Sequence, residues 1–357
     1  MENLGIFYKN KKVLVTGATG FKGSWLCSWL LELGSKVYGT GYSPNKNKKL
    51  FYSLNLQRKI NLSLFDIREF DKINNLIKKI KPQIIFHLAA QPLVYESFLK
   101  PKYTFEVNLL GTLNILEASK NCKNVRSIIC VTTDKVYDHI NYSKKFKESD
   151  RLGGDDPYSL SKASSELIIK SYREIFKKNS KNCSISSVRA GNVIGGGDWS
   201  DNRLVPDCIK SIKLQKQIVI RNPGYVRPWQ HVLDPLKGYL VLAKKQITQP
   251  KKFSGEWNFG PSDKKTVTVL NIAELIISFW GKGKIKISKK LNFKENKKLI
   301  LSIEKARKIL KWNNSLNTRE GVKKTIEWYF DVVENKKDPS DVTKEQIKNY
   351  MHICKIQ

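Results

Sequence analysis

Two ionisable residues, Asp134 and Lys135, stand directly behind a pair of threonines in the stretch VTTDKVY (131–137). The stretch follows the apolar run SIIC and precedes a polar segment, so we expect it to end a buried strand. A carboxyl and an amine placed together at a strand end can act as general acid and general base if their surroundings tune their pKa values. The alternative is an ordinary solvated strand end in a lysine-rich chain.

A glycine pattern, GATGFKG (17–23), stands between a predicted strand over KVLVTG and a helix expected from Phe21 to Leu33. Glycines at such a turn let backbone N–H groups approach a pyrophosphate, and the helix N-terminus favours negative charge. Three glycines could also simply form a turn. The strand before the pattern, the helix after it and the alternating units downstream favour dinucleotide binding.

The spacing GxxGxxG resembles that of the extended short-chain dehydrogenase/reductase family. The resemblance implies that Asp66 and Ile67 meet the adenine, that HLAAQ (87–91) lines the nicotinamide side, and that Asn108 belongs to the site. The cofactor-binding residues implied in this way are Gly17, Gly20, Phe21, Lys22, Gly23, Asp66, Ile67, Leu88, Ala89, Ala90, Gln91, Asn108, Tyr158 and Lys162. The second predicted strand ends in YGTGYSPN without an acid to hold the adenosine ribose, so the expectation of NAD over NADP rests on the resemblance.

The same resemblance implies a catalytic Tyr-xxx-Lys pair, and the chain offers three: Tyr8/Lys12, Tyr42/Lys46 and Tyr158/Lys162. We select Tyr158/Lys162 because only this pair begins a predicted helix, where residues i and i+4 share a face. In the family, the tyrosine removes a sugar hydroxyl proton, and the neighbouring lysine and oxidised nicotinamide lower its pKa.

A simple oxidoreductase or epimerase of this family needs little more than Tyr158 and a hydroxyl residue, here Thr133, so Asp134 and Lys135 are additional. A dehydration uses both. A ketone at C4 of a hexose acidifies the C5 proton; a base then removes that proton while an acid expels the C6 hydroxyl as water. The predicted catalytic residues are therefore Thr133, Asp134, Lys135, Tyr158 and Lys162.

The segment TTDKVY further resembles the CDP-glucose branch of the nucleotide-sugar 4,6-dehydratases, because the dTDP-glucose and GDP-mannose branches place glutamate where Lys135 stands. The segments GFKGSWL (20–26), RAGNVIGGGDW (189–199) and RPWQHVLDPLKGYL (227–240) agree, and the resemblance runs from about Lys12 to Tyr329. It implies conversion of CDP-D-glucose to CDP-4-keto-6-deoxy-D-glucose and water, by C4 oxidation, C5/C6 elimination and return of the hydride to C6.

A nucleotide sugar also needs cationic or amide donors for its diphosphate, since guanidinium groups match phosphate oxygens. By resemblance the substrate-binding residues are Thr133, Asn192, Arg203 and Arg227. A surface salt bridge is the alternative for any single arginine. Two positions depart from the pattern: Tyr95 stands where relatives commonly carry arginine, and Ser302 where they often carry aspartate.

The elements that must position these residues follow from apolar runs that alternate with helical patterns up to about residue 190. The runs read as strands are KVLVTG, KVYGTG, INLSLFD, QIIFHLAA, SIICVTT and CSISSVRA. This alternation predicts an α/β fold, a Rossmann-type doubly wound parallel sheet with a smaller, irregular α/β C-terminal lobe. We expect residues 1–190 to form the NAD-binding domain and residues 191–357 the nucleotide-sugar lobe, with some segments returning to the first domain. The last twenty-odd residues are polar and are expected to be loosely held.

Composition limits the other classes of function. The chain has 357 residues and a formal net charge of +33, which could attract nucleic acid. Its lysines are spread along the whole length and no nucleic-acid motif is visible, so we expect a solvated basic surface and no nucleic-acid or membrane partner. The N-terminus lacks a signal segment, and no apolar run spans a bilayer, which predicts a cytoplasmic protein. Six cysteines without a CxxC pair, together with four scattered histidines, predict reduced, mostly buried thiols and no metal.

Three other functions remain open at this point: a nucleotide-sugar 4-epimerase of the same fold, a dehydratase for dTDP- or GDP-hexoses, and a nucleotide- or RNA-binding protein without turnover. Lys135 disfavours the second, and the intact set of Thr133, Asp134, Tyr158 and Lys162 argues against the third. By resemblance, the helices around 98–120 and 158–178 pair across a two-fold axis, which predicts a homodimer or homotetramer.

Overall fold

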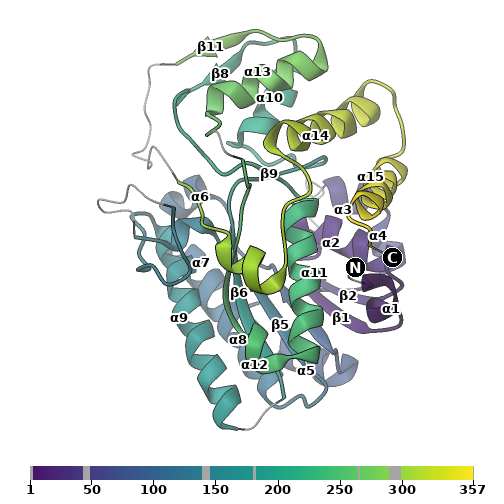
Figure 1. Ribbon diagram of the computed structural model, residues 1–357, viewed down its shortest axis with the longest axis vertical. Coiled ribbons are helices and arrows are strands. Elements are labelled where there is room, and N and C mark those ends of the chain that lie inside the picture. The colour runs from purple at the N-terminus through teal and green to yellow at the C-terminus, as the bar shows by residue number, and fades with distance from the viewer. Residues whose placement is uncertain are drawn as a thin grey trace.

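The computed structural model describes residues 3–42, 49–138, 145–179, 182–263, 266–288 and 299–356. Within these residues, seven parallel strands form a central sheet in the order β10-β6-β5-β4-β1-β2-β3 (Figure 1). The strands are β1 (Lys12–Thr16), β2 (Lys36–Gly41), β3 (Asn61–Leu64), β4 (Ile84–His87), β5 (Ser127–Val131), β6 (Ser184–Ala190) and β10 (Gly255–Phe259). The predicted doubly wound parallel sheet is confirmed.

The central strand β5 is apolar on both faces because each face of the sheet carries its own core. Successive residues of β5 alternate between the two: Ile128 and Cys130 pack in one cluster, and Ile129 and Val131 in the other. A strand buried on both faces therefore appears in the sequence as a continuous apolar run.

Helices cover both faces of the sheet. The helices that pack in the cluster of Ile128 are α5 (Phe70–Ile80), α8 (Gly111–Lys120) and α9 (Pro157–Lys178). The helices that pack in the cluster of Ile129 include α1 (Leu4–Tyr8), α2 (Phe21–Glu32) and α11 (Leu233–Thr248). Short helical segments join these elements: α3 (Lys49–Ser53), α4 (Leu56–Lys59), α6 (Val94–Leu99), α7 (Pro101–Phe105), the π-helical turn η1 (Glu106–Leu110), the 3-10 turn η2 (Asp134–Val136) and α12 (Pro250–Phe253).

A smaller lobe lies beyond the carboxyl ends of the strands, at the top of Figure 1. It contains two short parallel pairs of strands and several helices. These elements are β7 (Val193–Ile194) with β9 (Gln230–His231), β8 (Ile218–Ile220) with β11 (Ile285–Ile287), α10 (Leu204–Lys213), α13 (Val269–Trp280) and α14 (Thr318–Val333). Some later segments return to the sheet: β10 pairs with β6, and the π-helical turn η3 (Ala306–Leu310) packs near it.

The expectation of a loosely held C-terminus is wrong. The last twenty-odd residues contain the helix α15 (Pro339–Ile353), which buries Val342, Ile347 and Tyr350. The Tyr350 ring meets Trp29 of α2 edge-on, and its hydroxyl donates to Asp234 Oδ1 at 2.6 Å. The segment is mostly polar in composition, so its one apolar face was not recognised from the sequence.

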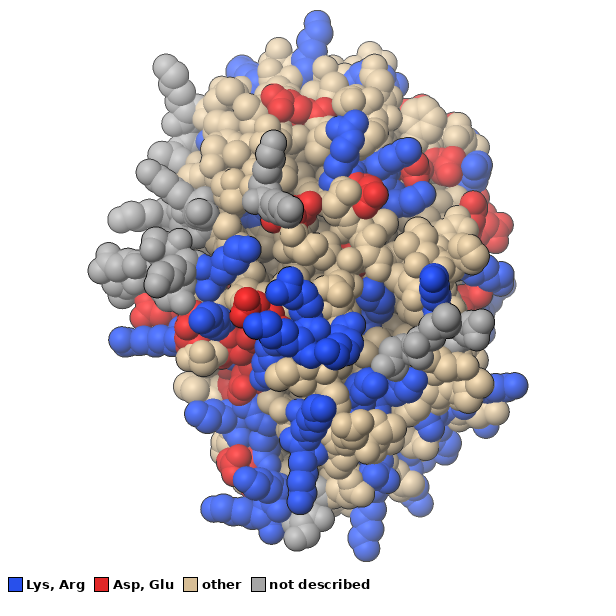
Figure 2. All heavy atoms as spheres, in the orientation of Figure 1, with Lys and Arg blue, Asp and Glu red and all other residues tan. Residues whose placement is uncertain are grey.

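Charge is spread widely over the face drawn in Figure 2. Figure 2 shows Lys and Arg side chains from the sheet to the smaller lobe, with Asp and Glu side chains among them. All six cysteines lie within the described residues as thiols, five of them buried, as the sequence predicted. Among the described residues, no helix combines the length and apolar character needed to cross a membrane.

Candidate active site

Strands β1 to β3 follow one another toward one edge of the sheet, and β4 to β6 follow one another from β1 toward the other edge. Such a switch point in strand order, here between β1 and β4, opens a crevice at the carboxyl ends of the strands. Gly17, directly after β1, has φ +69° and lies against the segment after β4. A Cβ atom on Gly17 would stand 2.7 Å from the Ala89 nitrogen, and one on Gly23 would stand 2.1 Å from the Gly17 oxygen. The backbone turn therefore requires glycine at both positions.

The same turn presents the N-terminus of α2. Gly20 is its N-cap and offers no side chain to the first N–H groups of the helix, while its own nitrogen donates to Gly17 O at 3.0 Å. Phe21 begins the helix, and its ring lies beside Gly195 of the smaller lobe. A helix N-terminus behind glycines suits an anionic pyrophosphate, so the predicted cradle for a dinucleotide fits the backbone that is present.

The remaining predicted cofactor residues follow the next two strands. Asp66, just beyond β3, forms a double hydrogen bond with Arg68, which holds the pKa of the carboxyl below its usual value against the opposing effect of burial. Ile67 lies against Gly111 of α8. Leu88, Ala89 and Ala90 follow β4 as partly buried residues, and Gln91 after them is buried.

Asn108 lies in the π-helical turn η1 and is almost completely buried. Its amide accepts from the Gln91 backbone at 2.9 Å and donates to Ser161 Oγ of α9 at 2.8 Å. Asn108 thus joins the loop after β4 to the helix that carries Tyr158. π-Helical turns occur often at functional sites, because the extra residue redirects a side chain.

At the end of β5, Asp134 is 3% exposed, so the interpretation as a solvated strand end does not hold. Thr133 caps the turn η2, accepts from the Lys135 backbone nitrogen at 3.4 Å and donates to Asp134 Oδ1 at 3.1 Å. Burial raises the pKa of Asp134, and the charges of Lys135 and Arg227 partly oppose the rise. Asp134 Oδ2 is buried without a hydrogen-bond partner among the described residues.

Tyr158 and Lys162 lie on the first turns of α9, where Asp156 caps the helix by accepting from the Ser159 nitrogen at 2.9 Å. The Tyr158 phenol is hydrogen-bonded to Thr133. Lys162 Nζ donates to Val131 O, the last carbonyl of β5, at 3.2 Å. Burial lowers the pKa of Lys162 to about 8.

The surroundings of Tyr158 act on its pKa in opposing directions. Burial is the largest influence and raises the pKa of Tyr158 to about 12, while the hydrogen bond with Thr133 and the charge of Arg203 act in the opposite direction. The sequence showed the neighbouring lysine but could not show how deeply the phenol is buried.

The other two Tyr-xxx-Lys pairs have different places. The Tyr8 hydroxyl is buried and donates to Leu240 O at 2.9 Å, and Lys12 Nζ donates to Ile80 O at 3.1 Å. Both contacts join elements of the core. Tyr42 is exposed, and Lys46 lies outside the described residues.

The arginines predicted to bind substrate approach the same region from the smaller lobe. The Arg227 guanidinium lies over the Tyr225 ring at 5.1 Å and donates to Val226 O at 3.1 Å, and its charge lowers the pKa of Asp134. Arg203 Nη1 donates to Asp198 Oδ2 at 2.9 Å. The backbone oxygen of Asn192 accepts from the Gln230 nitrogen at 3.1 Å, and the Asn192 side chain is partly buried.

Two further residues join this group. Lys22 was predicted only as a cofactor contact, but its charge interacts with those of Asp134, Lys162 and Arg203; burial, followed by the two cations, lowers its pKa to about 8. Asp198, from the segment GGGDW, was not singled out in the sequence. It accepts a hydrogen bond from Arg203, and its charge acts to raise the pKa of Lys22. Its place in a glycine-rich loop was the only available signal.

This arrangement places a phenol, a hydroxyl and a buried carboxyl in one hydrogen-bonded series, with amines close by. The hydrogen bond with Thr133 holds the phenol in place. The phenol can then exchange a proton with a substrate hydroxyl. The carboxyl, whose pKa is raised, can hold a proton and deliver it to a leaving hydroxyl group.

A protein family and several individual proteins resemble this chain in sequence. Residues 14–325 match the family described as GDP-mannose 4,6 dehydratase. A CDP-glucose 4,6-dehydratase from Salmonella typhimurium is 39% identical over 350 residues, covering 97% of each chain. A UDP-glucose 4-epimerase from Mycoplasma genitalium is 27% identical over 250 residues, covering 65% of this chain and 71% of the other.

Solved structures share the fold. A dTDP-glucose 4,6-dehydratase from Bacillus anthracis, in complex with NAD, has a TM-score of 0.74 at 23% identity and covers 91% of this chain and 98% of its own. A UDP-glucose 4-epimerase from Thermotoga maritima, with UDP-glucose, has a TM-score of 0.76 at 23% identity, with coverage of 90% and 99%.

Proposed function

The chain belongs to the GDP-mannose 4,6 dehydratase family, and from this membership we propose that it is an NAD-dependent hydro-lyase that converts CDP-D-glucose to CDP-4-keto-6-deoxy-D-glucose and water. The CDP-glucose 4,6-dehydratase relative, with 39% identity over nearly the whole chain, supports this choice among nucleotide sugars.

The observation that carries the proposal is the environment of Asp134. Its carboxyl is buried, its pKa is raised, and its Oδ2 atom has no partner among the described residues although the neighbouring Thr133 hydroxyl is hydrogen-bonded to Tyr158. Leaving such a group unpaired costs stability, so a role in the reaction is the best account of it. An epimerase has no need of a proton donor there.

The residues present fit a nicotinamide dinucleotide. Gly17 and Gly23 form a turn that a Cβ atom would fill, and the α2 N-terminus behind it suits the pyrophosphate. Asp66 and Ile67 would hold the adenine end, and the segment from Leu88 to Gln91 would line the nicotinamide end. NAD, when bound, supplies a reversible hydride acceptor.

The protein side chains supply the proton transfers. We propose that Tyr158 takes the proton of the C4 hydroxyl, with Thr133 fixing the phenol, and that Lys162 holds the helix and strand together at Val131 O. Asp134, whose pKa is raised by burial, donates a proton to the departing C6 hydroxyl. Lys135 removes the C5 proton.

The smaller lobe supplies the contacts to the nucleotide. We propose that Arg203, Arg227 and Asn192 bind the diphosphate or its ribose. Both arginines lie close enough to the catalytic residues to affect them: the charge of Arg203 lowers the pKa of Tyr158, and that of Arg227 lowers the pKa of Asp134. Residues 191–357 would thus form the nucleotide-sugar lobe, apart from segments such as β10 that return to the sheet, and residues 1–190 the NAD-binding domain.

We further propose that two copies of the chain associate through the helices α6 to α9. Large apolar side chains are exposed on these helices and on the turn between them: Phe98, Leu99, Leu110, Leu160 and Leu167. A second copy would cover them, as expected for a symmetric dimer.

The test is incubation of the purified protein with CDP-, dTDP-, GDP- and UDP-hexoses, each with NAD or NADP, followed by mass spectrometry of the product. A product lighter than CDP-glucose by one water molecule, formed with NAD, is expected. An isomer of unchanged mass would assign a 4-epimerase instead, and water loss from another nucleotide sugar would correct the substrate.

A further inference from the structure

We propose that the buried ion pair between Glu166 and Arg189 positions the catalytic segment 133–135, holding the residue before it through Thr132 and the residues after it through Tyr137. The proposal rests on the proposed function, since it concerns how the residues of that site are held in position. Glu166 and Arg189 are positioning residues: their side chains are 1% and 2% exposed and act through the residues that they bind.

The pair joins α9 to β6. Arg189 Nε donates to Glu166 Oε1 and Arg189 Nη2 donates to Glu166 Oε2, each at 2.9 Å. Glu166 follows Lys162 by four residues on the face that already carries Tyr158. A buried ion pair is seldom more stabilising than well-packed apolar residues, so stability alone does not account for its presence.

The first anchor precedes the catalytic segment. Thr132 Oγ1 donates to Glu166 Oε1 at 2.5 Å. Thr132 is the residue immediately before Thr133, so this bond fixes the point where the chain leaves β5. The helix that carries Tyr158 and Lys162 therefore also holds the start of the segment that carries Thr133, Asp134 and Lys135.

The second anchor follows the catalytic segment. Arg189 Nη1 donates to the Tyr137 hydroxyl at 2.9 Å, and that hydroxyl donates in turn to Asn258 Oδ1 of β10 at 2.7 Å. Arg189 Nη1 also donates to Glu148 O at 3.0 Å, and the Glu148 carboxylate accepts from the Asn258 nitrogen at 2.9 Å. The end of the segment is thereby tied to two strands of the sheet.

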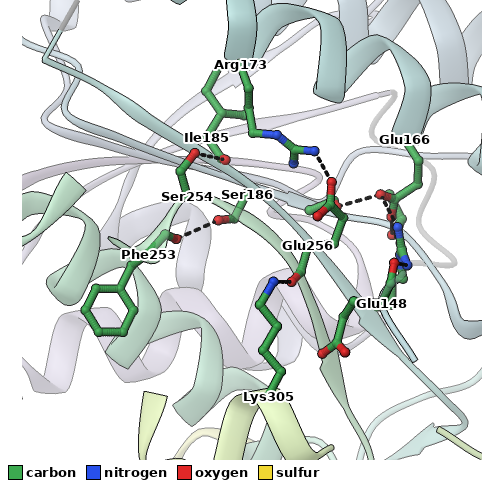
Figure 3. Close-up of polar contacts among 12 residues, drawn as sticks. Glu148, Glu166, Arg173, Ile185, Ser186, Phe253, Ser254, Glu256 and Lys305 are labelled. Atoms are coloured by element: carbon green, nitrogen blue, oxygen red, sulfur yellow. Dashed lines mark hydrogen bonds and ion pairs between the residues drawn. The ribbon is translucent and has the colours of Figure 1, made fainter. Parts of the chain in front are cut away.

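Figure 3 shows the polar contacts of Glu166 and, beside them, a second group of contacts around Glu256. Arg173 of α9 pairs with Glu256 of β10, and Lys305 Nζ donates to Glu256 O at 2.7 Å. The network thus connects α9, β6 and β10. The turn η2 lies between the two residues that this network binds, Thr132 and Tyr137.

The chain offers a matched control for the first anchor. Ser187 Oγ donates to Glu166 Oε2 at 2.6 Å, so Thr132 and Ser187 give the same carboxylate one hydroxyl hydrogen bond each, but Ser187 belongs to β6 and not to the catalytic segment. The variants to compare are Thr132→Val, Tyr137→Phe and Ser187→Ala, which all keep the ion pair, with Thr132→Ser to restore the hydroxyl.

The experiment measures kcat and KM for CDP-glucose with NAD, and amide hydrogen exchange of peptides covering residues 131–138. Thr132→Val and Tyr137→Phe are expected to lower kcat about tenfold or more with KM nearly unchanged, because small displacements of reacting groups are costly. Both should speed exchange in 131–138. Ser187→Ala should change neither quantity, and Thr132→Ser should recover both.

Equal losses of kcat in Thr132→Val and Ser187→Ala, or unchanged exchange in 131–138 in Thr132→Val and Tyr137→Phe, would overturn the positioning role. If the wild-type protein leaves CDP-glucose unchanged, the proposed function fails. The exchange comparison between Thr132→Val and Ser187→Ala then decides the anchoring by itself.

Discussion

Tyr158 and Asp134 are connected through one hydroxyl group: Thr133 is hydrogen-bonded to the phenol of Tyr158 and donates to Asp134 Oδ1 at 3.1 Å. The charge of Asp134 raises the pKa of Tyr158. A protonated Asp134 therefore makes the phenol easier to ionise, and by reciprocity an ionised phenol favours the protonated carboxyl. The group proposed for oxidation and the group proposed for elimination support each other's required protonation states.

Asp134→Asn should remove the proposed acid while keeping the shape of the side chain. We expect the rate of water loss to fall by about 10²–10⁴, and reduced nicotinamide to accumulate because C4 oxidation remains possible. At neutral pH an aspartate in the unfolded chain is ionised, whereas burial raises the pKa of Asp134 in the folded protein, so folding carries a cost that asparagine avoids and the variant should also melt at a higher temperature. Product mass spectrometry, nicotinamide absorbance and calorimetry test this.

Asp201→Asn is the control for that variant, because the Asp201 side chain is 84% exposed and pairs only with Lys210 at 2.5 Å among the described residues. It should retain both the wild-type rate and the wild-type melting temperature. Full water loss by Asp134→Asn would assign the acid to another group.

Lys135→Met tests the proposed base. The variant should abolish incorporation of solvent deuterium at C5, because the amine is gone, while some C4 oxidation persists. NMR of substrate and product recovered from deuterium oxide measures the exchange. Lys147→Met changes an exposed lysine of the same region and should exchange as the wild type does. Normal exchange in Lys135→Met would remove Lys135 as the base.

Much of the fold follows from local sequence, because the six runs read as strands contain β1 to β6 and the main covering helices repeat their apolar residues at helical spacing, whereas β10 was not predicted. The cradle at Gly17 and the pair Tyr158/Lys162 could be located in the same way, since glycine spacing and i, i+4 spacing are local patterns.

Contacts between distant segments could not be read from the sequence. Glu166 and Arg189 lie 23 residues apart, and nothing local shows that they pair. The depth at which the Tyr158 phenol is buried, which raises its pKa, depends on the whole fold. The C-terminal segment that forms α15 was expected to be loosely held, because the sequence did not show that Tyr350 packs against Trp29 and bonds to Asp234.

Gly23→Ala should disrupt the proposed dinucleotide cradle, since the new Cβ atom would stand 2.1 Å from the Gly17 oxygen. We expect a loss of about 1–3 kcal/mol in the free energy of unfolding from the overpacking, together with weaker NAD binding. Gly224→Ala is the control: a Cβ atom there meets nothing within 4 Å. Calorimetry and NAD titration measure both variants, and equal NAD affinity in the two would place the cofactor elsewhere.

Leu167→Asp tests the proposed association of two chains. Leu167 is 59% exposed on α9, and a charge there would be buried unpaired in the dimer, so we expect a monomer. Leu214→Asp alters a leucine of similar exposure, 62%, at the end of α10, and should leave the dimer intact. Light scattering after size-exclusion chromatography measures the mass. A Leu167→Asp dimer would move the interface away from α9.

Asp234 should make the attachment of α15 sensitive to pH. Asp234 Oδ1 accepts from the Ser315 nitrogen and the Tyr350 hydroxyl, both at 2.6 Å, while burial raises its pKa from 3.8 to about 6. Between those pH values the folded protein binds more protons than the unfolded chain, so this group's contribution to stability is complete below about pH 4 and is lost as pH rises through 6. At 1.36 kcal/mol for each pH unit, the loss is on the order of 3 kcal/mol.

Asp234→Asn keeps an acceptor for Ser315 and Tyr350 but cannot ionise. We therefore expect it to match the wild type in free energy of unfolding near pH 4 and to exceed it at pH 7, with the difference opening between those values. Asp341→Asn, an exposed change on the first turn of the same helix, should follow the wild-type curve throughout. Denaturant titrations at a series of pH values measure the three curves. Parallel curves for wild type and Asp234→Asn would mean that the Asp234 carboxyl titrates normally, and that the hydrogen bonds from Tyr350 and Ser315 outweigh its burial.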